Sequence, residues 1–345
     1  PVPTNSSELA AYTAEDKVFA AGCQSRSGAE LPYVSTVDAA MDMDILRADV
    51  GDPKLTYLGF SYGTFLGATY ADLFPGRVRA MVLDGALDPS LPVIKSLEEQ
   101  AAGFDSDLRD ALNACQANTK CPWKPSGDPM AAFQQLLAQV TNQPLAVSGT
   151  SRTVGPAILL NGTALTLYDT SDWKYLYDAL ALASRGDGSD FLQLSDDYTE
   201  RSSDGTYGNL LEAFTAVNCL DQPAPSITDI QAALPGARRL APVYGPTSLY
   251  SEIQCEVWPV PATGKVGPIH AAGSPPIVVV GTTGDPATPY PDAQALASQL
   301  ENGVLLTRVG DGHTAYQYSS CIRRYVDSYL IDLTTPGAGI RCPTK

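Results

Sequence analysis

The sequence is short of histidine and of basic side chains, and both shortages exclude classes of function. It contains 2 histidines, and its 7 cysteines include no Cys-x-x-Cys pair, so we expect neither a metal site nor a cofactor. Its 22 basic against 38 acidic residues give a net charge of −16, which argues against binding to nucleic acid or to an anionic membrane surface. No apolar run approaches the roughly 20 residues needed to span a bilayer.

The cysteines indicate an oxidising environment. Pairing between neighbours in the sequence leaves Cys23 over and gives three disulfides, Cys115–Cys121, Cys219–Cys255 and Cys321–Cys342. A disulfide framework in an acidic chain is typical of a secreted, extracellular protein, whereas seven reduced cysteines in a cytosolic enzyme are the alternative. The start at Pro1 shows no signal peptide and resembles a processed or truncated end.

What the sequence does contain is a strand, a sharp turn and a helix around one serine. An apolar run leads into Gly59-Phe60-Ser61-Tyr62-Gly63, and a helix is expected from Thr64 to Leu73. In this context a Gly-x-Ser-x-Gly pattern predicts a nucleophile elbow, with the serine at a strained position between small residues. Ser61 is therefore the expected nucleophile, and the N–H of Tyr62 the expected oxyanion donor. A plain small-residue turn is the alternative.

The rest of the chain predicts an α/β-hydrolase fold, a mostly parallel sheet flanked by helices, with a large helical lid. Residues 1–90 and 273–345 would form the core, and residues 91–272 the lid. Strand-like runs occur at 79–84, 277–281 and 303–309. Helical patterns in the lid are expected at Ile94–Cys115, Pro129–Val140, Asp172–Ser184, Asn209–Asn218 and Thr228–Leu234.

An acid and a histidine follow Ser61 in the order that a catalytic triad of this fold requires. Asp285 comes just after one strand and His313 just after the next, at the strand ends where open α/β sheets place their sites. The rival histidine is His270, which reads as an ordinary loop residue. The rival acids are Asp84, which we interpret as a turn residue, and Asp311, which is too close to His313 in sequence to orient its ring.

These motifs resemble those of secreted bacterial tripeptidyl aminopeptidases, in the proline-iminopeptidase-like branch of the α/β-hydrolases. The motifs are Gly59–Thr64, Leu83-Asp84-Gly85, Gly284-Asp285-Pro286, Gly312–Ala315, the Cys321…Cys342 tail and, in the lid, Ala216–Asp221. The resemblance implies a serine exopeptidase with Ser61 as nucleophile, Asp285 as acid and His313 as base. Its substrate would be the unblocked N-terminus of a peptide, from which it releases tripeptides or other short peptides.

A free N-terminus needs a carboxylate to bind its ammonium group. The lid offers four acids, Glu212, Asp221, Glu252 and Glu256. Asp221 is the preferred partner, because a disulfide at Cys219 would hold its backbone still, and Glu212 is the second candidate. An ordinary surface acid is the alternative for each of them.

Two other functions stay open. The same triad would serve a secreted esterase or lipase-like hydrolase. A processed fragment or a binding protein of the same fold would have no catalytic activity.

The family's early strands and its Gly-Gly-Pro-Gly oxyanion loop have no counterpart here. Residues 1–54 read as two helices, at about 6–23 and 36–50, without a strand. We therefore expect the N-terminal part of the sheet to lie outside this chain. A further N-terminal segment of the same protein would supply it, together with a second oxyanion donor and a partner for Cys23. A compact variant that needs no such segment is the alternative.

Overall fold

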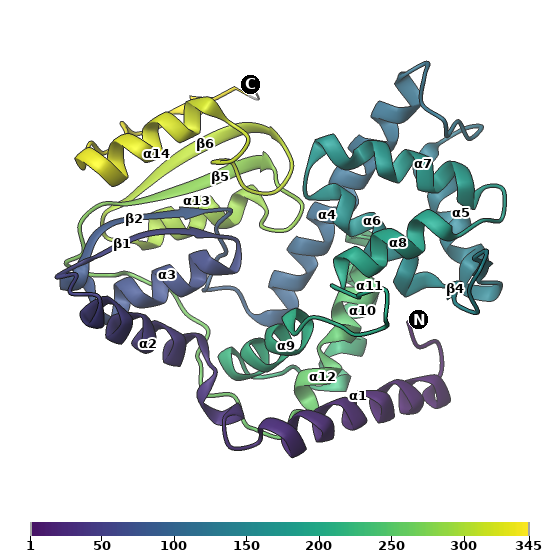
Figure 1. The fold of residues 1–345 in the computed structure, drawn as a ribbon, viewed down its shortest axis with the longest axis horizontal. Helices are drawn as coiled ribbons and strands as arrows, with labels where there is room; N and C mark the ends of the chain where they lie inside the picture. Colours follow the sequence, from purple (N-terminus) through teal and green to yellow (C-terminus); the bar gives the residue numbers. More distant parts are fainter. Residues whose placement is uncertain (1, 344–345) are drawn as a thin grey trace.

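A sheet of five parallel strands forms the centre of the computed structural model, which describes residues 2–343 (Figure 1). The strand order is β1-β2-β5-β6-β7, and every pair of neighbours is parallel. The bounds are Leu55–Phe60 for β1, Val78–Asp84 for β2, Ile277–Gly284 for β5, Gly303–Asp311 for β6 and Arg341–Cys342 for β7. The strands predicted from the sequence are thus confirmed, and β1 lies at one edge of this sheet.

Helices cover both faces of the sheet, which explains why its strands read as continuous apolar runs. In β5, Ile277 and Val279 pack toward α2 (Thr36–Asp49), α3 (Tyr62–Leu73) and α13 (Tyr290–Gln299). Val278 and Val280 point the other way, toward α14 (Ser320–Asp332). Figure 1 shows α14 on one side of the strands and α3 and α13 on the other.

Two helices precede β1, as predicted. Both begin at a side-chain cap: Asn5 accepts a hydrogen bond from the N–H of Glu8 at the start of α1 (Ser6–Ser27). At the start of α2 (Thr36–Asp49), Ser35 and Asp38 form a capping box. Helix α2 packs on α3 beside the sheet.

Helix α1 departs from the expected assignment of residues 1–90 to the core. Its Phe19 ring lies 6.2 Å from that of Trp258, and its Tyr12 ring lies 6.3 Å from that of Tyr250. These partners belong to the segment between β2 and β5, so α1 packs on the lid and not on the sheet.

The segment between β2 and β5 forms a helical cap beside the sheet, with its own apolar core (Figure 1). Its helices are α4 (Val93–Ala117), α5 (Pro129–Asn142), α6 (Pro156–Leu167), α7 (Trp173–Ala183), α8 (Ser189–Tyr198), α9 (Leu210–Asp221), α10 (Ile227–Leu240), α11 (Gly245–Ser251) and α12 (Ile253–Glu256). A two-stranded hairpin, β3 (Leu145–Ala146) with β4 (Thr153–Val154), joins α5 to α6. The five predicted lid helices are present, whereas α6, α8, α11 and α12 were not predicted.

Helix α6 escaped prediction because it is buried nearly all round. Its residues are mostly apolar, and no side of the helix is polar. It also contains Gly162 and two threonines, which are weak helix formers. The glycine has a packing role: a Cβ at Gly162 would lie 3.0 Å from the carbonyl oxygen of Phe191 in α8. The close contact between α6 and α8 therefore depends on it.

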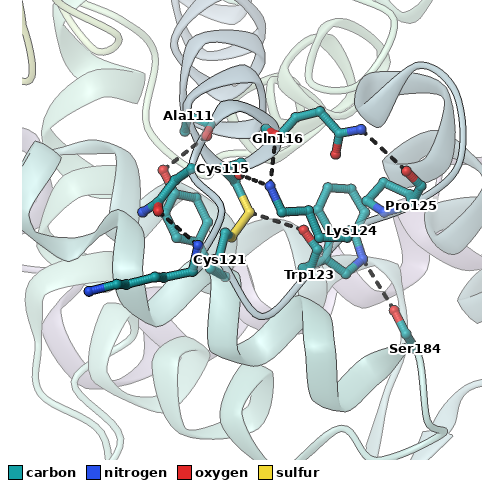
Figure 2. The surroundings of a disulfide bond; sticks show 11 residues. Ala111, Cys115, Gln116, Cys121, Trp123, Lys124, Pro125 and Ser184 are labelled. Carbon is teal, nitrogen blue, oxygen red and sulfur yellow. Dashed lines mark hydrogen bonds between the residues drawn. A yellow bond between two sulfur atoms is a disulfide. The ribbon is translucent and has the colours of Figure 1, made fainter.

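All three expected disulfides are present. Cys219–Cys255 joins α9 to α12, and Cys321–Cys342 joins α14 to β7. Cys115–Cys121 closes the end of α4, where Figure 2 shows Lys124 Nζ reaching back to the carbonyl oxygens of Cys115 (2.9 Å) and Gln116 (2.7 Å). A lysine at this position satisfies the last helix carbonyls and complements the helix dipole.

Cys23, left over by this pairing, is half-buried and unpaired in the described part of the chain. Of the helices within residues 2–343, none is both long enough and apolar enough to cross a membrane.

One buried acid in the cap has no hydrogen-bond partner within residues 2–343. Asp107, on α4, is buried, and neither carboxylate oxygen is bonded. Burial raises the pKa of Asp107 to about 8, and the nearby charges of Asp311, Asp110 and Asp285 add to the shift. The folded state therefore favours the neutral carboxyl group.

We predict that Asp107→Asn makes the protein more resistant to alkaline unfolding. Because the pKa of Asp107 is about 8 in the folded protein and 3.8 is the ordinary value for aspartate, its contribution to stability is present at low pH and is lost as pH rises through this window. Asparagine does not ionise, so the variant loses no such contribution to stability as the pH rises. The melting temperature of the variant should exceed that of the wild type by at least ~2 °C at alkaline pH, and by less in acid. Asp42→Asn, at an exposed position of α2, is the control, and an equal gain from it would contradict the prediction.

Candidate active site

Ser61 occupies a strained turn between β1 and α3. Its φ of 52° and ψ of −122° are rare for a residue other than glycine. Its N–H donates to the carbonyl oxygen of Asp84 at the end of β2, and its own carbonyl accepts from the N–H and hydroxyl of Thr64. Tyr62 begins α3, so its N–H has no acceptor within the helix. This is the geometry predicted for a nucleophile elbow.

The glycines around Ser61 permit this turn. A Cβ at Gly59 would lie 2.4 Å from the carbonyl oxygen of Gly63, so any side chain there would displace the backbone. At Gly63 a Cβ would meet only the hydroxyl of Tyr57, at 3.2 Å. The expected crowding is therefore severe at the first glycine and mild at the second.

Asp285 and His313 follow neighbouring strands, and the structure brings their side chains into contact. Nδ1 of His313 lies 2.8 Å from Oδ1 of Asp285 and 3.0 Å from Oδ2, and both side chains are buried. Nε2 of His313 is buried as well and has no hydrogen-bond partner within residues 2–343. This nitrogen is therefore free among the described residues to accept a hydrogen bond or a proton.

Backbone groups hold the carboxylate of Asp285 in place. The N–H groups of Ala287 and Thr288 donate to Oδ1 at 3.0 and 2.9 Å, and the N–H of Thr314 donates to Oδ2 at 3.0 Å. These bonds compensate for burial of the carboxylate and fix its orientation toward the imidazole.

His313 itself is fixed from the cap and from β2. Its N–H donates to the carbonyl oxygen of Tyr168 at 2.8 Å, and the Tyr168 ring meets the imidazole edge to face, at 5.2 Å between centroids. A Cβ at Gly85, which has a φ of +71°, would lie 3.2 Å from Cε1 of His313. Since Asp84 next to Gly85 also binds the N–H of Ser61, the turn after β2 connects the serine to the histidine.

Asp84 does not contact His313. Its Oδ2 instead accepts from the N–H groups of Ala315 (3.1 Å) and Tyr316 (2.8 Å), while Oδ1 has no partner among the described residues. Burial raises the pKa of Asp84 to about 6. Asp84 thus supports the loop that follows His313. This role was not predicted from the sequence, where Asp84 was interpreted as a turn residue.

The other rivals also lie apart from the imidazole. His270 is exposed, and its Nδ1 lies 2.9 Å from the carbonyl oxygen of Gln299. Asp311 lines a cavity of about 170 Å³ together with Tyr168, Arg308 and Gly312. A larger cavity of about 440 Å³ lies between α1 and α10, away from this site, so volume does not mark the candidate active site.

Asp221 lies near the elbow, but Thr36 already binds it. The N–H of Thr36 donates to Oδ1 at 2.7 Å, and its hydroxyl donates to Oδ2 at 2.5 Å. The same hydroxyl lies 2.6 Å from the phenol oxygen of Tyr62. Asp221 is buried, which raises its pKa.

Glu212 does not join Asp221. It is exposed in the first turn of α9, about two and a half turns from Asp221 and on the opposite side of the helix. Within residues 2–343 there is no group of His, Cys, Asp or Glu side chains that could hold a metal ion.

A parallel sheet with a serine at a strained elbow, followed along the chain by a paired aspartate and histidine at strand ends, defines an α/β-hydrolase of the serine-hydrolase class. Comparison with known proteins narrows this class. The family model described as TAP-like protein matches residues 241–342. Serine protease Hip1 of Mycobacterium tuberculosis is 40% identical over 348 residues, which cover 95% of this chain and 65% of the relative.

Two further relatives also carry the names of hydrolases. Carboxylesterase B of Mycobacterium tuberculosis is 39% identical over 332 residues, and the tripeptidyl aminopeptidase of Streptomyces lividans is 29% identical over 352 residues. The chain spans 64% of each of these two. The chain is therefore similar to TAP-like α/β-hydrolases over nearly its whole length. Among solved structures, an α/β-hydrolase from a deep-sea metagenome library aligns over 89% of this chain and 75% of that one. The sequence identity is 12% and the TM-score 0.35.

We predict that Asp285→Asn lowers kcat far more than Asp84→Asn. An asparagine at 285 cannot hold the imidazole in the required tautomer, and the equivalent change in a serine protease costs about 10⁴-fold. Asp84→Asn keeps an oxygen for the N–H groups of Ala315 and Tyr316 and should cost less than about 10-fold. Steady-state kinetics of the two folded variants measure this. The reverse order would move the acid of the triad to the end of β2.

Proposed function

We propose that this chain carries the catalytic triad of a serine exopeptidase that releases tripeptides, or other short peptides, from free N-termini. The observation that supports it most strongly is the contact between His313 and Asp285 at the strand ends, beside a serine with a φ of 52°. The names of two relatives, a serine protease and a tripeptidyl aminopeptidase, favour a peptide substrate. The three disulfides support an extracellular location.

In this proposal the reaction proceeds through an acyl-enzyme. Nε2 of His313 removes the proton from Oγ of Ser61 while Oγ attacks the scissile carbonyl carbon. The peptide C–N bond breaks, His313 gives the proton to the leaving amine, and the N-terminal peptide stays on Ser61 as an ester. Water, deprotonated by His313, then hydrolyses the ester. Asp285 remains ionised throughout and stabilises the imidazolium.

The N–H of Tyr62 would bind the oxyanion that forms during the attack. It lies at the first residue of α3, where the helix dipole also favours negative charge. Each such donor contributes about 10²–10³-fold in kcat in other hydrolases.

Asp221 is the proposed partner of the substrate ammonium. A carboxylate can accept about four hydrogen bonds, and Thr36 uses two of them. Two hydrogen bonds through Thr36 connect Asp221 to the side chain of Tyr62, next to the proposed nucleophile, and support this role. Glu212 is the second candidate, and its exposure at the start of α9 makes it the weaker one.

An esterase is the second candidate function. The triad would hydrolyse an ester by the same steps, and one relative at 39% identity is named a carboxylesterase. A binding protein without activity is the third.

A fluorophosphonate probe tests whether the triad is active. We expect it to label the wild type at Ser61, and Ser61→Ala to prevent labelling. His313→Ala should slow labelling by several orders of magnitude, since the serine would lose its base. Mass spectrometry locates the label. An unlabelled, folded wild-type protein would favour the processed fragment or the binding protein, and labelling of folded Ser61→Ala would place the nucleophile elsewhere.

The free amine is tested with three reporters: a tripeptide, its N-acetylated form and a simple ester. We expect hydrolysis of the free tripeptide to be fastest. Asp221→Asn should raise KM for the free tripeptide by about 10-fold or more, equivalent to at least 1.4 kcal/mol, and leave hydrolysis of the acetylated form unchanged. Glu212→Gln tests the second candidate in the same way, and Asp178→Asn, at an exposed position of α7 in the cap, is the control. Equal cleavage of free and acetylated peptides would contradict the exopeptidase proposal and favour the esterase.

A further inference from the structure

We propose that Tyr168, a cap residue, is a positioning residue for His313, so that the cap sets the geometry of the base. This inference rests on the proposed function, because it takes His313 as the base. Tyr168 is the C-cap residue of α6, far from the triad in sequence and outside the sheet that carries Ser61 and Asp285.

Tyr168 touches His313 in two independent ways. Its carbonyl oxygen accepts the backbone N–H of His313 at 2.8 Å, which holds the main chain. Its ring stands at 85° to the imidazole, with 5.2 Å between centroids, which holds the side chain. Asp285 fixes only Nδ1 of the imidazole, so the ring of Tyr168 supplies a contact that the hydrogen bond does not.

The backbone next to His313 is shaped to receive Tyr168. Gly312 has a φ of +99°, and a Cβ there would lie 3.2 Å from the carbonyl oxygen of Tyr168. Thr314, on the other side of His313, has a φ of 66°. Glycine adopts this conformation at little cost, whereas the positive φ of Thr314 is costly unless neighbouring contacts fix it.

Tyr168 is in turn fixed by the cap. Its ring lies 5.9 Å from that of Phe104 on α4, and Phe104 lies 5.2 Å from Tyr244. The carboxylate of Asp105, also on α4, accepts the N–H groups of Val243 and Tyr244 at 3.0 and 2.9 Å. The imidazole therefore contacts a cluster that unites three separate segments of the cap.

Three variants separate positioning from general support of the cap. Tyr168→Ala removes the ring and leaves the carbonyl bond. Tyr168→Phe keeps the ring and removes only the hydroxyl group. Tyr177→Ala is the matched control, since Tyr177 packs against the same apolar core of the cap and its hydroxyl binds the carbonyl oxygen of Ala111, away from His313.

The first measurement is the rate at which a small fluorophosphonate labels Ser61, together with kcat and KM for the tripeptide reporter. A displacement of about 1 Å in a catalytic group can cost about 100-fold. We expect Tyr168→Ala to lower the labelling rate and kcat by about 10- to 100-fold, with less than about 3-fold change in KM. Tyr168→Phe should restore both rates to within about 3-fold of wild type, and Tyr177→Ala should leave them unchanged.

The second measurement does not need activity. The chain has 2 histidines, so selective ¹⁵N labelling of histidine gives one ring signal set for His313 and one for His270. We expect the Nδ1–H signal of His313, hydrogen-bonded to Asp285, to broaden or disappear in Tyr168→Ala. It should persist in Tyr168→Phe and Tyr177→Ala. His270 is exposed and should not change in any variant.

The results distinguish this inference from the proposed function. If the wild type is not labelled by the probe, the proposed function fails, and the histidine signals alone decide whether Tyr168 positions His313. Wild-type labelling together with an unchanged Nδ1–H signal in Tyr168→Ala would overturn the inference. Equal losses in Tyr168→Ala and Tyr177→Ala would also overturn it, since they would mean general damage to the cap.

Discussion

The position of one imidazole depends on contacts from four separate parts of the chain. Asp285 after β5 binds Nδ1, Gly85 after β2 approaches Cε1, and Tyr168 from the cap holds both the backbone and the ring. The fourth is the pair of left-handed residues on either side of His313. None of these contacts is local in sequence apart from the last. The site therefore forms only when the sheet and the cap have folded together, and its strain is compensated by the contacts of both.

Backbone donors decide which buried acid can act as the acid of the triad. The chain carries a net charge of −16, and several of its carboxylates are nonetheless buried. Three backbone N–H groups bind Asp285, two bind Asp84, and none binds Asp107. The pKa of Asp84 is raised to about 6 and that of Asp107 to about 8. The pKa is thus higher for the carboxylate that has fewer backbone donors. Of these three acids, Asp285 has the most backbone donors, which compensate for burial of its carboxylate beside the imidazole.

Sequence reasoning succeeded where the determining interactions are local. The elbow at Ser61, the helix over 36–49 with its capping box, and the disulfides between neighbouring cysteines all follow from short-range patterns. It missed α6, because a helix buried on all sides has no polar face to reveal its period. It also missed the link from Asp221 to Thr36, which joins residues 185 positions apart, and the contact of Tyr168 with His313, for which the sequence carries no signal.

The cap contacts the candidate site on both sides of the triad. On the nucleophile's side, Asp221 at the end of α9 connects through Thr36 to the side chain of Tyr62, the residue after Ser61. On the base's side, Tyr168 connects to His313. Tyr62 and His313 are therefore each tied to the cap as well as to the sheet. Within residues 2–343, Nε2 of His313 has no hydrogen-bond partner. In the proposed reaction this nitrogen would bond Oγ of Ser61, in a contact that often tightens only when substrate binds.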